Sequence, residues 1–236
     1  LTQIAIAAGA DVIYEAAFCY NDVFFKADIL RRTSAGWEIY EVKASTTTKE
    51  VHIEDIALQG YVLQGLGMKL VGTYLMHINN KYIRQGDIEI RKLFMVEDVS
   101  RDVDTLRPEV ARHLVSMRTA LQGGIPEIDI GTHCNDPYGC DFSGHCWQHI
   151  PSPSVFDFAR IGKKSFELYS KGILRMEDTP PECLNVKQVM QLDSWIHQRE
   201  YIELPELRQF LKLFRYPLCF MDFETFATPV PLYDGI

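Results

Sequence analysis

The chain has 236 residues, of which 47% are hydrophobic, and a formal net charge of −8. This length and composition allow one well-packed core and a smaller second unit. The negative charge argues against a surface that is basic overall, as many nucleic-acid-binding domains have. A local basic patch remains compatible with it, and basic residues gather in the first part of the chain: Lys26, Arg31, Arg32, Lys43 and Lys49.

The first part of the chain predicts a short helix followed by three strands. Residues 1–9 have a helix-like pattern, and residues 12–20 are expected to form a strand that pairs with the next one. Aromatic and β-branched residues dominate 23–30 and 37–42, which therefore predict two further strands. The polar turn between them suits a hairpin connection.

Three chemically active side chains lie toward the ends of these strands. Asp28 is in the second strand, while Glu41 and Lys43 are two positions apart in the third and so face the same side. Two acids and a lysine that converge can hold a divalent metal beside a charged amine, which suits phosphodiester hydrolysis. The alternative is an exposed hairpin whose charges are only solvated.

The order Asp28, spacer, Glu41-Val42-Lys43 resembles the PD-(D/E)XK nuclease superfamily. The resemblance implies an α/β fold in which helices flank a mixed central sheet. It also implies that Asp28 and Glu41 bind Mg²⁺ or Mn²⁺ with the Val42 carbonyl, while Lys43 stabilises the transition state. Relatives often carry a glutamate in the preceding strand, so Glu15 is a candidate catalytic residue, with an edge-strand charge as the alternative.

The next segment predicts a helix and a strand. Apolar residues recur at three-and-four spacing through 52–66, and Gly67 marks a helix end before a strand at 70–78. RecB-like nucleases place a glutamine and a tyrosine on the helix after the Glu-x-Lys strand, and Gln59 and Tyr61 look similar. The family spaces these residues four apart, whereas here they are two apart. We therefore expect Gln59 to orient water or phosphate and Tyr61 to pack at the sheet edge.

A strand at 91–99 and a helix at 102–122 are expected before a loop, 125–150, that contains Cys134, Cys140 and Cys146 at six-residue steps. The chain has six cysteines and no apolar run long enough to cross a membrane. We therefore expect a reducing cytoplasmic setting, no membrane partner, and a metal on the clustered thiols. Three thiolates need a fourth ligand for an iron–sulfur cluster or a zinc ion, and His133 or His145 could supply it to zinc.

The cysteine loop resembles that of RecB-like nucleases of the AddB and CRISPR-associated type. In those proteins, three cysteines after the nuclease core and one well before it bind a [4Fe–4S] cluster. Here no cysteine precedes the first predicted strand, and the early histidine or glutamate motif of the family is not identifiable. We therefore expect the chain to be truncated at its N-terminus, with the fourth cluster ligand outside it.

Residues 151–215 open with a proline- and serine-rich boundary and predict a helical linker. Helices are expected at 154–170, 185–199 and 205–214. The charges of this region are mixed and form no basic stripe, so we expect a packing module rather than a DNA-binding element.

The last region, 216–236, predicts a strand that ends on two acids. Residues 216–226 are strongly apolar, and Asp222 and Glu224 fall on one face at period-two spacing. The segment resembles the first metal-binding motif of DnaQ-like exonucleases of the RNase H-like fold, which implies that both acids help to bind metal. The later acidic motifs of that family are absent, so we expect a truncated domain start that is inactive here. A buried strand with incidental acids is the alternative.

These motifs occur in the same order as in a little-characterised bacterial family that joins a RecB-like core, a cysteine loop and an Asp-Phe-Glu-Thr domain. The resemblance implies a nuclease core at 1–124, an iron–sulfur loop at 125–150, a linker at 151–215 and an exonuclease start at 216–236. We expect a metal-dependent deoxyribonuclease, exonucleolytic or end-processing, that acts on single-stranded DNA or DNA ends. The alternative is a non-catalytic nucleic-acid-binding scaffold with a zinc-bound cysteine loop.

Metal analysis distinguishes the two metals considered for the loop. Protein purified without oxygen is expected to contain iron and acid-labile sulfide, because clustered thiolates are the usual ligands of iron–sulfur clusters. The contents of iron, sulfide and zinc, measured on one sample, check this expectation. A colourless protein that carries zinc in place of iron would contradict it.

Overall fold

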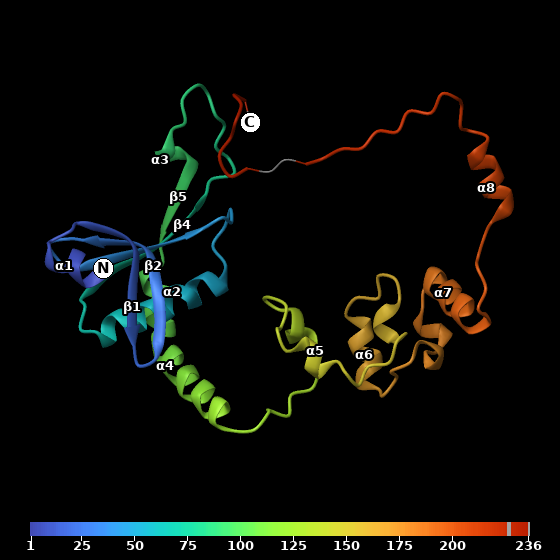
Figure 1. Cartoon of the computed structure of the whole chain (residues 1–236), viewed down its shortest axis with the longest axis horizontal. Coiled ribbons are helices and arrows are strands. Elements are labelled where there is room, and N and C mark those ends of the chain that lie inside the picture. Colours follow the sequence, from blue (N-terminus) through green and yellow to red (C-terminus); the bar gives the residue numbers. More distant parts are fainter. Residues whose placement is uncertain (226–227, 236) are drawn as a thin grey trace. The chain divides into compact units, whose positions relative to one another are not determined.

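The computed structural model describes residues 1–225 and 228–235 and divides the chain into two compact units. We call Leu1–Pro126 with Glu224–Ile236 the sheet unit, and Glu127–Phe223 the helical unit. All the strands found among the described residues belong to the sheet unit (Figure 1).

The sheet unit begins with one helix and three successive strands, after which helices and strands alternate. The strands predicted at 12–20 and 70–78 are confirmed at both ends. The hairpin strands are also confirmed, each slightly longer than expected. In chain order, the elements are α1 (Thr2–Ala7), β1 (Val12–Tyr20), β2 (Val23–Arg32), β3 (Trp37–Lys43), α2 (Glu50–Gly65), β4 (Leu70–Ile78), α3 (Ile90–Leu93), β5 (Phe94–Asp98) and α4 (Ser100–Gln122).

The strands form one mixed sheet in the order β1-β2-β3-β4-β5. Neighbouring strands are antiparallel except β3 and β4, which are parallel and are connected through α2. A parallel pair requires such a crossover, since a tight turn can join only antiparallel strands. The expected α/β class, with helices flanking a mixed sheet, is therefore confirmed.

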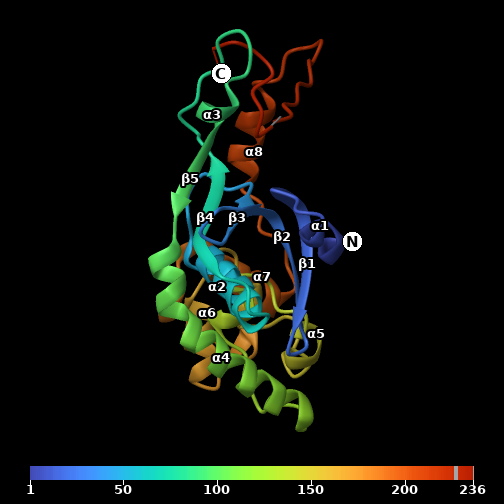
Figure 2. The same ribbon diagram turned by 90° about the vertical axis from the view of Figure 1, so that its left-hand side faces the viewer.

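The core of the sheet unit lies between the sheet and α2, and α4 packs against α2 (Figure 2). Alternation along β3 turns Ile39 and Glu41 to this buried side. Fully buried side chains from the other elements include Leu30 of β2, Ile56 of α2 and Leu75 of β4. Glu41 therefore enters an apolar environment because it shares a strand face with core residues.

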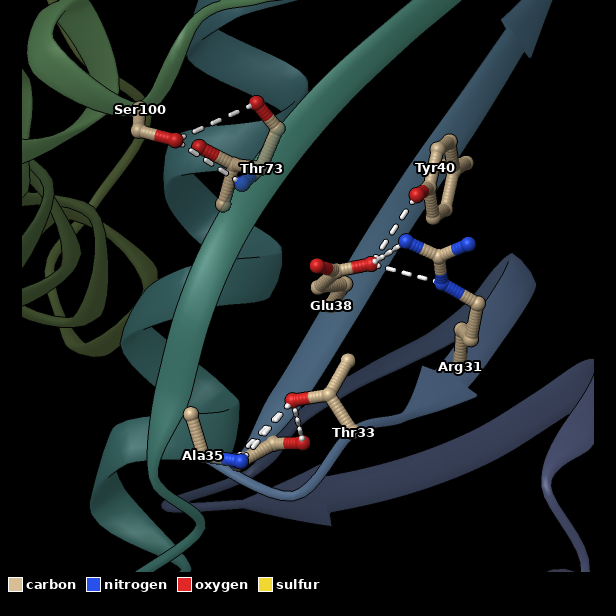
Figure 3. Close-up of polar contacts among 8 residues, drawn as sticks. Arg31, Thr33, Ala35, Glu38, Tyr40, Thr73 and Ser100 are labelled. Carbon is tan, nitrogen blue, oxygen red and sulfur yellow. Dashed lines mark hydrogen bonds and ion pairs between the residues drawn. The ribbon is translucent and has the colours of Figure 1, made fainter.

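Polar contacts on the other face of the sheet fix the register of β2 and β3 (Figure 3). The Glu38 carboxylate accepts a hydrogen bond from Arg31 Nε at 2.7 Å and another from the Tyr40 hydroxyl at 2.9 Å. At the turn, Thr33 Oγ1 accepts from the backbone N–H groups of Ala35 and Gly36. A shift of one residue would turn Glu41 away from the core, so these contacts also determine where the candidate site lies.

The strand predicted at 91–99 is partly wrong, because its first residues form the short helix α3 before β5 begins at Phe94. The backbone N–H groups of Lys92 and Leu93 donate to the Glu89 carbonyl at 2.8 and 3.0 Å. The Lys92 ammonium also pairs with the Glu89 carboxylate, and the turn buries Leu93. Local hydrogen bonds and one apolar contact therefore override the strand pattern there.

The helical unit contains short helices and 3₁₀ turns. One helix was expected over 154–170, but Arg160 and Gly162 have φ values of 54° and 60°, which a right-handed helix cannot contain. None of the helices among residues 1–225 and 228–235 combines the length and apolar character needed to cross a membrane. The elements are η1 (Thr132–Asn135), α5 (Ser143–Cys146), η2 (Val155–Asp157), α6 (Lys164–Ser170), η3 (Met176–Asp178), η4 (Pro181–Cys183), α7 (Val186–His197) and α8 (Leu204–Leu211).

The strand predicted at 216–226 is wrong for its described part, since residues 216–225 form no strand; Phe226 lies outside the described residues. A strand needs neighbours for its backbone hydrogen bonds and a surface for its apolar face. Phe220 is 93% exposed and Phe223 is 81% exposed, so these apolar side chains have no such surface in the described chain.

Two glycines of α2 provide a matched test of how closely this helix packs. A Cβ atom at Gly65 would overlap the Tyr20 ring, whereas a Cβ at Gly60 would lie 3.6 Å from its nearest neighbours, Leu70 and Val103. We expect Gly65→Ala to lower the free energy of unfolding by about 1–3 kcal/mol through overpacking. Gly60→Ala should raise it by roughly 0.5–1 kcal/mol, because alanine favours helix. Urea unfolding measures both, and equal effects would contradict the packing described here.

Candidate active site

The pairing of β1 with β2 is interrupted where Glu15 faces Asp28. Pairing continues on both sides of this point, but Glu15 has a φ of 51°, which is uncommon for a residue other than glycine. Ala27 and Leu30 are both buried although they are three positions apart, so β2 changes its facing at Asp28. Such local irregularities re-aim side chains. Here Asp28 Oδ2 accepts a hydrogen bond of 2.7 Å from the Val42 backbone N–H of β3.

Glu15 does not join the candidate site in this arrangement. Its side chain is 67% exposed, and its carboxylate lies 3.8 Å from the Lys26 ammonium, which is itself 54% exposed. An ion pair between two exposed side chains is a common feature of a strand surface and contributes little to stability. The structure therefore places Glu15 opposite Asp28 in the strand pair but orients its charge toward Lys26.

Glu41 and Lys43 lie together at the end of β3. Glu41 is only 9% exposed, and its Oε1 is 2.8 Å from Lys43 Nζ. Its other oxygen, Oε2, accepts a hydrogen bond of 2.6 Å from Gln59 Nε2 of α2. A buried carboxylate requires such partners, because an unpaired charge in a protein interior is costly. The predicted residues Glu41, Lys43 and Gln59 are therefore brought into direct contact.

Lys43 also contacts a second carboxylate, that of Asp55 on α2, at 2.7 Å. Burial alone would lower the pKa of Lys43, but the hydrogen bonds to Asp55 and Glu41 outweigh it and raise the pKa above its ordinary value. The side chain therefore remains an ammonium at neutral pH. It can stabilise negative charge but cannot act as a general base there.

Sequence reasoning missed Asp55 and His52, which precede Gln59 on α2 by four and seven positions. This spacing places all three on one helix face, so the prediction for Gln59 could have indicated the other two. His52 is 5% exposed, and its Nδ1 accepts a hydrogen bond of 3.3 Å from the Lys49 backbone N–H. Burial and the charges of Lys43 and Lys49 lower the pKa of His52. The ring is therefore neutral at pH 7 and carries its proton on Nε2.

Tyr61 points elsewhere. Its ring packs edge-on against Tyr20, with 5.8 Å between the ring centroids, and its hydroxyl accepts a hydrogen bond from Asn21 Nδ2 at 3.1 Å. These contacts agree with the expectation that Tyr61 packs at the sheet edge.

The oxygen atoms near the end of β3 suit a hard divalent cation. Asp28 and Glu41 are carboxylates, and Asp28 contacts the backbone of Val42, which follows Glu41 in β3. Among residues 1–225 and 228–235, no three His, Cys, Asp or Glu side chains form a group that could hold a metal ion. Two carboxylates still fit Mg²⁺ or Mn²⁺, since Mg²⁺ is usually bound through one or two carboxylates together with water and phosphate oxygens.

The three cysteines of the loop differ in their exposure to solvent. Cys134 is buried, Cys146 is half-buried and Cys140 is exposed, and the backbone N–H of Cys140 donates to the Cys134 carbonyl at 2.8 Å. His133 and His145 are both exposed. In the described part of the chain these side chains do not gather into a metal-sized group, so the iron–sulfur cluster and the zinc alternative remain predictions.

The two acids of the last region are not brought to a site either. Asp222 and Glu224 are both exposed, and Asp222 Oδ1 accepts a hydrogen bond from the adjacent Phe223 N–H at 2.8 Å. Among residues 1–225 and 228–235, no strand pairs with the segment that carries them and could hold the two carboxylates in a fixed geometry. Their role in metal binding remains a prediction.

A second polar cluster lies beside the candidate site, on β4 and β5. His77 is 4% exposed, and its two ring nitrogens lie 3.0 Å from the Ile78 carbonyl and 3.1 Å from Glu97 Oε1. Thr48, in the loop between Lys43 and α2, donates to the other oxygen of Glu97. Because both ring nitrogens face acceptors, the contacts are complete only when His77 is a cation.

Comparisons with known proteins do not add to this geometry. Models of protein families give no match to the sequence, and a search of curated proteins finds no significant match.

The His77–Glu97 pair predicts a pH-dependent stability. Burial opposes the charge on His77, but the hydrogen bonds to Ile78 and Glu97 raise its pKa above the ordinary value of about 6.5. The stabilisation is therefore complete below that ordinary pKa and is lost as the pH rises through the raised one. Between pH 6 and pH 9, the parent should lose more unfolding free energy than Glu97→Gln. Urea unfolding at both pH values measures this, and identical losses would exclude the pair as the cause.

Proposed function

We propose that the sheet unit is a metal-dependent deoxyribonuclease of the PD-(D/E)XK type, with its active site at the end of β3. The observation that carries this proposal is the contact of the buried Glu41 carboxylate with Lys43 at 2.8 Å and with Gln59 at 2.6 Å. Asp28 adds a second carboxylate through its hydrogen bond to the Val42 backbone. Paired carboxylates beside a fixed ammonium suit phosphodiester hydrolysis.

In this proposal Asp28, Glu41 and the Val42 carbonyl would hold Mg²⁺ or Mn²⁺. When bound, such an ion lowers the pKa of water and offsets negative charge on the phosphate. Gln59 fixes the Glu41 carboxylate through its 2.6 Å hydrogen bond, which leaves Glu41 a single orientation. The resemblance led us to expect that Gln59 orients water or phosphate. The observed hydrogen bond supports instead a role in orienting Glu41.

Hydrolysis requires that a water oxygen bonds to phosphorus while the bond from phosphorus to one sugar oxygen breaks. The leaving oxygen gains a proton, and the phosphate carries additional negative charge during the reaction. Lys43 donates hydrogen bonds to the phosphate at that stage, since its raised pKa keeps it protonated. The proton of the attacking water goes to solvent or to a carboxylate, because a protonated amine cannot accept it.

DNA, single-stranded or at its ends, is the substrate that we propose, with exonucleolytic or end-processing cleavage. Lys43 and the exposed Lys49 lie at either end of the loop that leads into α2, where they offer positive charge to a phosphate backbone. The iron–sulfur cluster expected on Cys134, Cys140 and Cys146 would hold the nuclease core together, and the proposed reaction requires no redox role from it.

Cleavage of end-labelled DNA tests the proposal. The anaerobically purified protein should degrade single-stranded or double-stranded DNA in the presence of Mn²⁺, and Lys43→Ala should be about 10²–10³-fold slower because it lacks a charge that stabilises the transition state. Glu41→Gln should lose activity as well, since it lacks a metal ligand.

Lys69→Ala is the matched control. Lys69 is exposed and precedes β4, at the opposite end of the β3–β4 pair from Lys43, so its loss should leave the rate unchanged. Equal cleavage by the parent and Lys43→Ala would refute this active site. If neither protein cuts while both bind DNA, the non-catalytic scaffold becomes the better description.

A further inference from the structure

The ammonium of Lys43 is held between carboxylates that come from two different elements. Its Nζ lies 2.8 Å from Glu41 Oε1 on β3 and 2.7 Å from Asp55 Oδ2 on α2. The two distances are nearly equal, but the surroundings differ. The Glu41 side chain is 11% exposed, whereas that of Asp55 is 46% exposed. Lys43 thus bridges an enclosed acid and an open one.

The geometry of α2 explains why one helix can reach both members of the Glu41–Lys43 pair. Asp55 and Gln59 are four residues apart and therefore lie one above the other on the same helix face. Gln59 contacts Glu41 and Asp55 contacts Lys43, so each residue of the pair on β3 has its own partner on α2. Residues four apart on α2 are thus spaced to reach residues two apart on β3, and the two contacts together fix the side chains of Glu41 and Lys43.

A metal ion bound to Glu41 would change the balance of charges on Lys43. The carboxylate would then share its negative charge with a divalent cation, and that cation would repel the ammonium next to it. The Lys43 ammonium would then keep its position only if another anion attracted it. Asp55 is such an anion, and it contacts Lys43 without contacting Glu41 or Asp28.

We propose that Asp55 is a positioning residue, which holds the Lys43 ammonium at the active site when Glu41 binds the metal. This inference rests on the proposed nuclease function. Asp55 touches neither substrate nor metal in this account, and it acts through Lys43. Because a half-exposed ion pair adds little to stability, the role of Asp55 should be visible in catalysis rather than in unfolding.

Three variants test the proposal by steady-state kinetics of Mn²⁺-dependent DNA cleavage. Asp55→Asn removes the charge and should lower kcat roughly 10- to 100-fold, as supporting partners of metal-site residues do, with little change in KM. Asp55→Glu keeps the charge and should recover part of the loss. Glu54→Gln removes a charge from the exposed neighbouring position on α2 and should behave as the parent does.

The chemical reactivity of Lys43 gives a second readout that does not need cleavage. Reductive methylation followed by mass spectrometry should label Lys43 faster in Asp55→Asn than in the parent, because the amine loses a partner that holds it at 2.7 Å and becomes more accessible to the reagent. The labelling of Lys43 in Glu54→Gln should match that of the parent.

The outcomes separate this proposal from the nuclease function itself. Unchanged kcat and unchanged Lys43 labelling in Asp55→Asn would overturn it. A loss of kcat accompanied by loss of cooperative unfolding would also overturn it, since Asp55 would then be structural. If the parent does not cut DNA but Asp55→Asn labels faster, Asp55 does hold Lys43 and the nuclease function is what fails.

Discussion

Burial of Glu41 is the constraint on which the candidate site depends. The residue is 9% exposed, and burial of a carboxylate without partners costs several kcal/mol. The partners have to come from whatever covers that face of the sheet, and α2 covers it because the parallel strands β3 and β4 need a crossover between them. The topology that makes the sheet mixed therefore also brings Gln59 and Asp55 to Glu41 and Lys43.

The second constraint is the interruption of the β1–β2 ladder. An uninterrupted strand could not bury both Ala27 and Leu30 in one core, since alternation turns residues three apart to opposite faces. The positive φ of Glu15 costs about 1–3 kcal/mol, and the burial of apolar residues on both sides offsets it. Asp28 lies at the point where β2 changes its facing, which directs its carboxylate to the Val42 backbone.

The local sequence pattern predicted those features of the fold that depend only on residues close together in the chain. The strands at 12–20 and 70–78 follow from their residue types, and the pair Glu41 and Lys43 follows from period two. The spacing of Asp55 from Gln59 places both on one helix face, but its contact with Lys43 depends on the packing of α2 over β3, which the sequence does not state. The strand predicted at 216–226 is wrong for residues 216–225 for the opposite reason: their side chains favour a strand, but no neighbouring strand pairs with them among the described residues. Strand propensity says how well a residue suits a sheet surface, but it does not provide the neighbouring strands with which the segment would pair.

The charges around the candidate site would link the proposed binding of metal to the proposed binding of DNA. Glu41 and Asp55 both contact the Lys43 ammonium, and a third carboxylate, that of Asp28, contacts the backbone of the neighbouring Val42. A phosphate backbone approaching this excess of negative charge is repelled, and the net charge of −8 adds to the repulsion at low salt. A divalent cation on Asp28 and Glu41 would cancel this local excess. Binding of the metal would then strengthen binding of a phosphate. By thermodynamic linkage, binding of the phosphate would strengthen binding of the metal by the same factor.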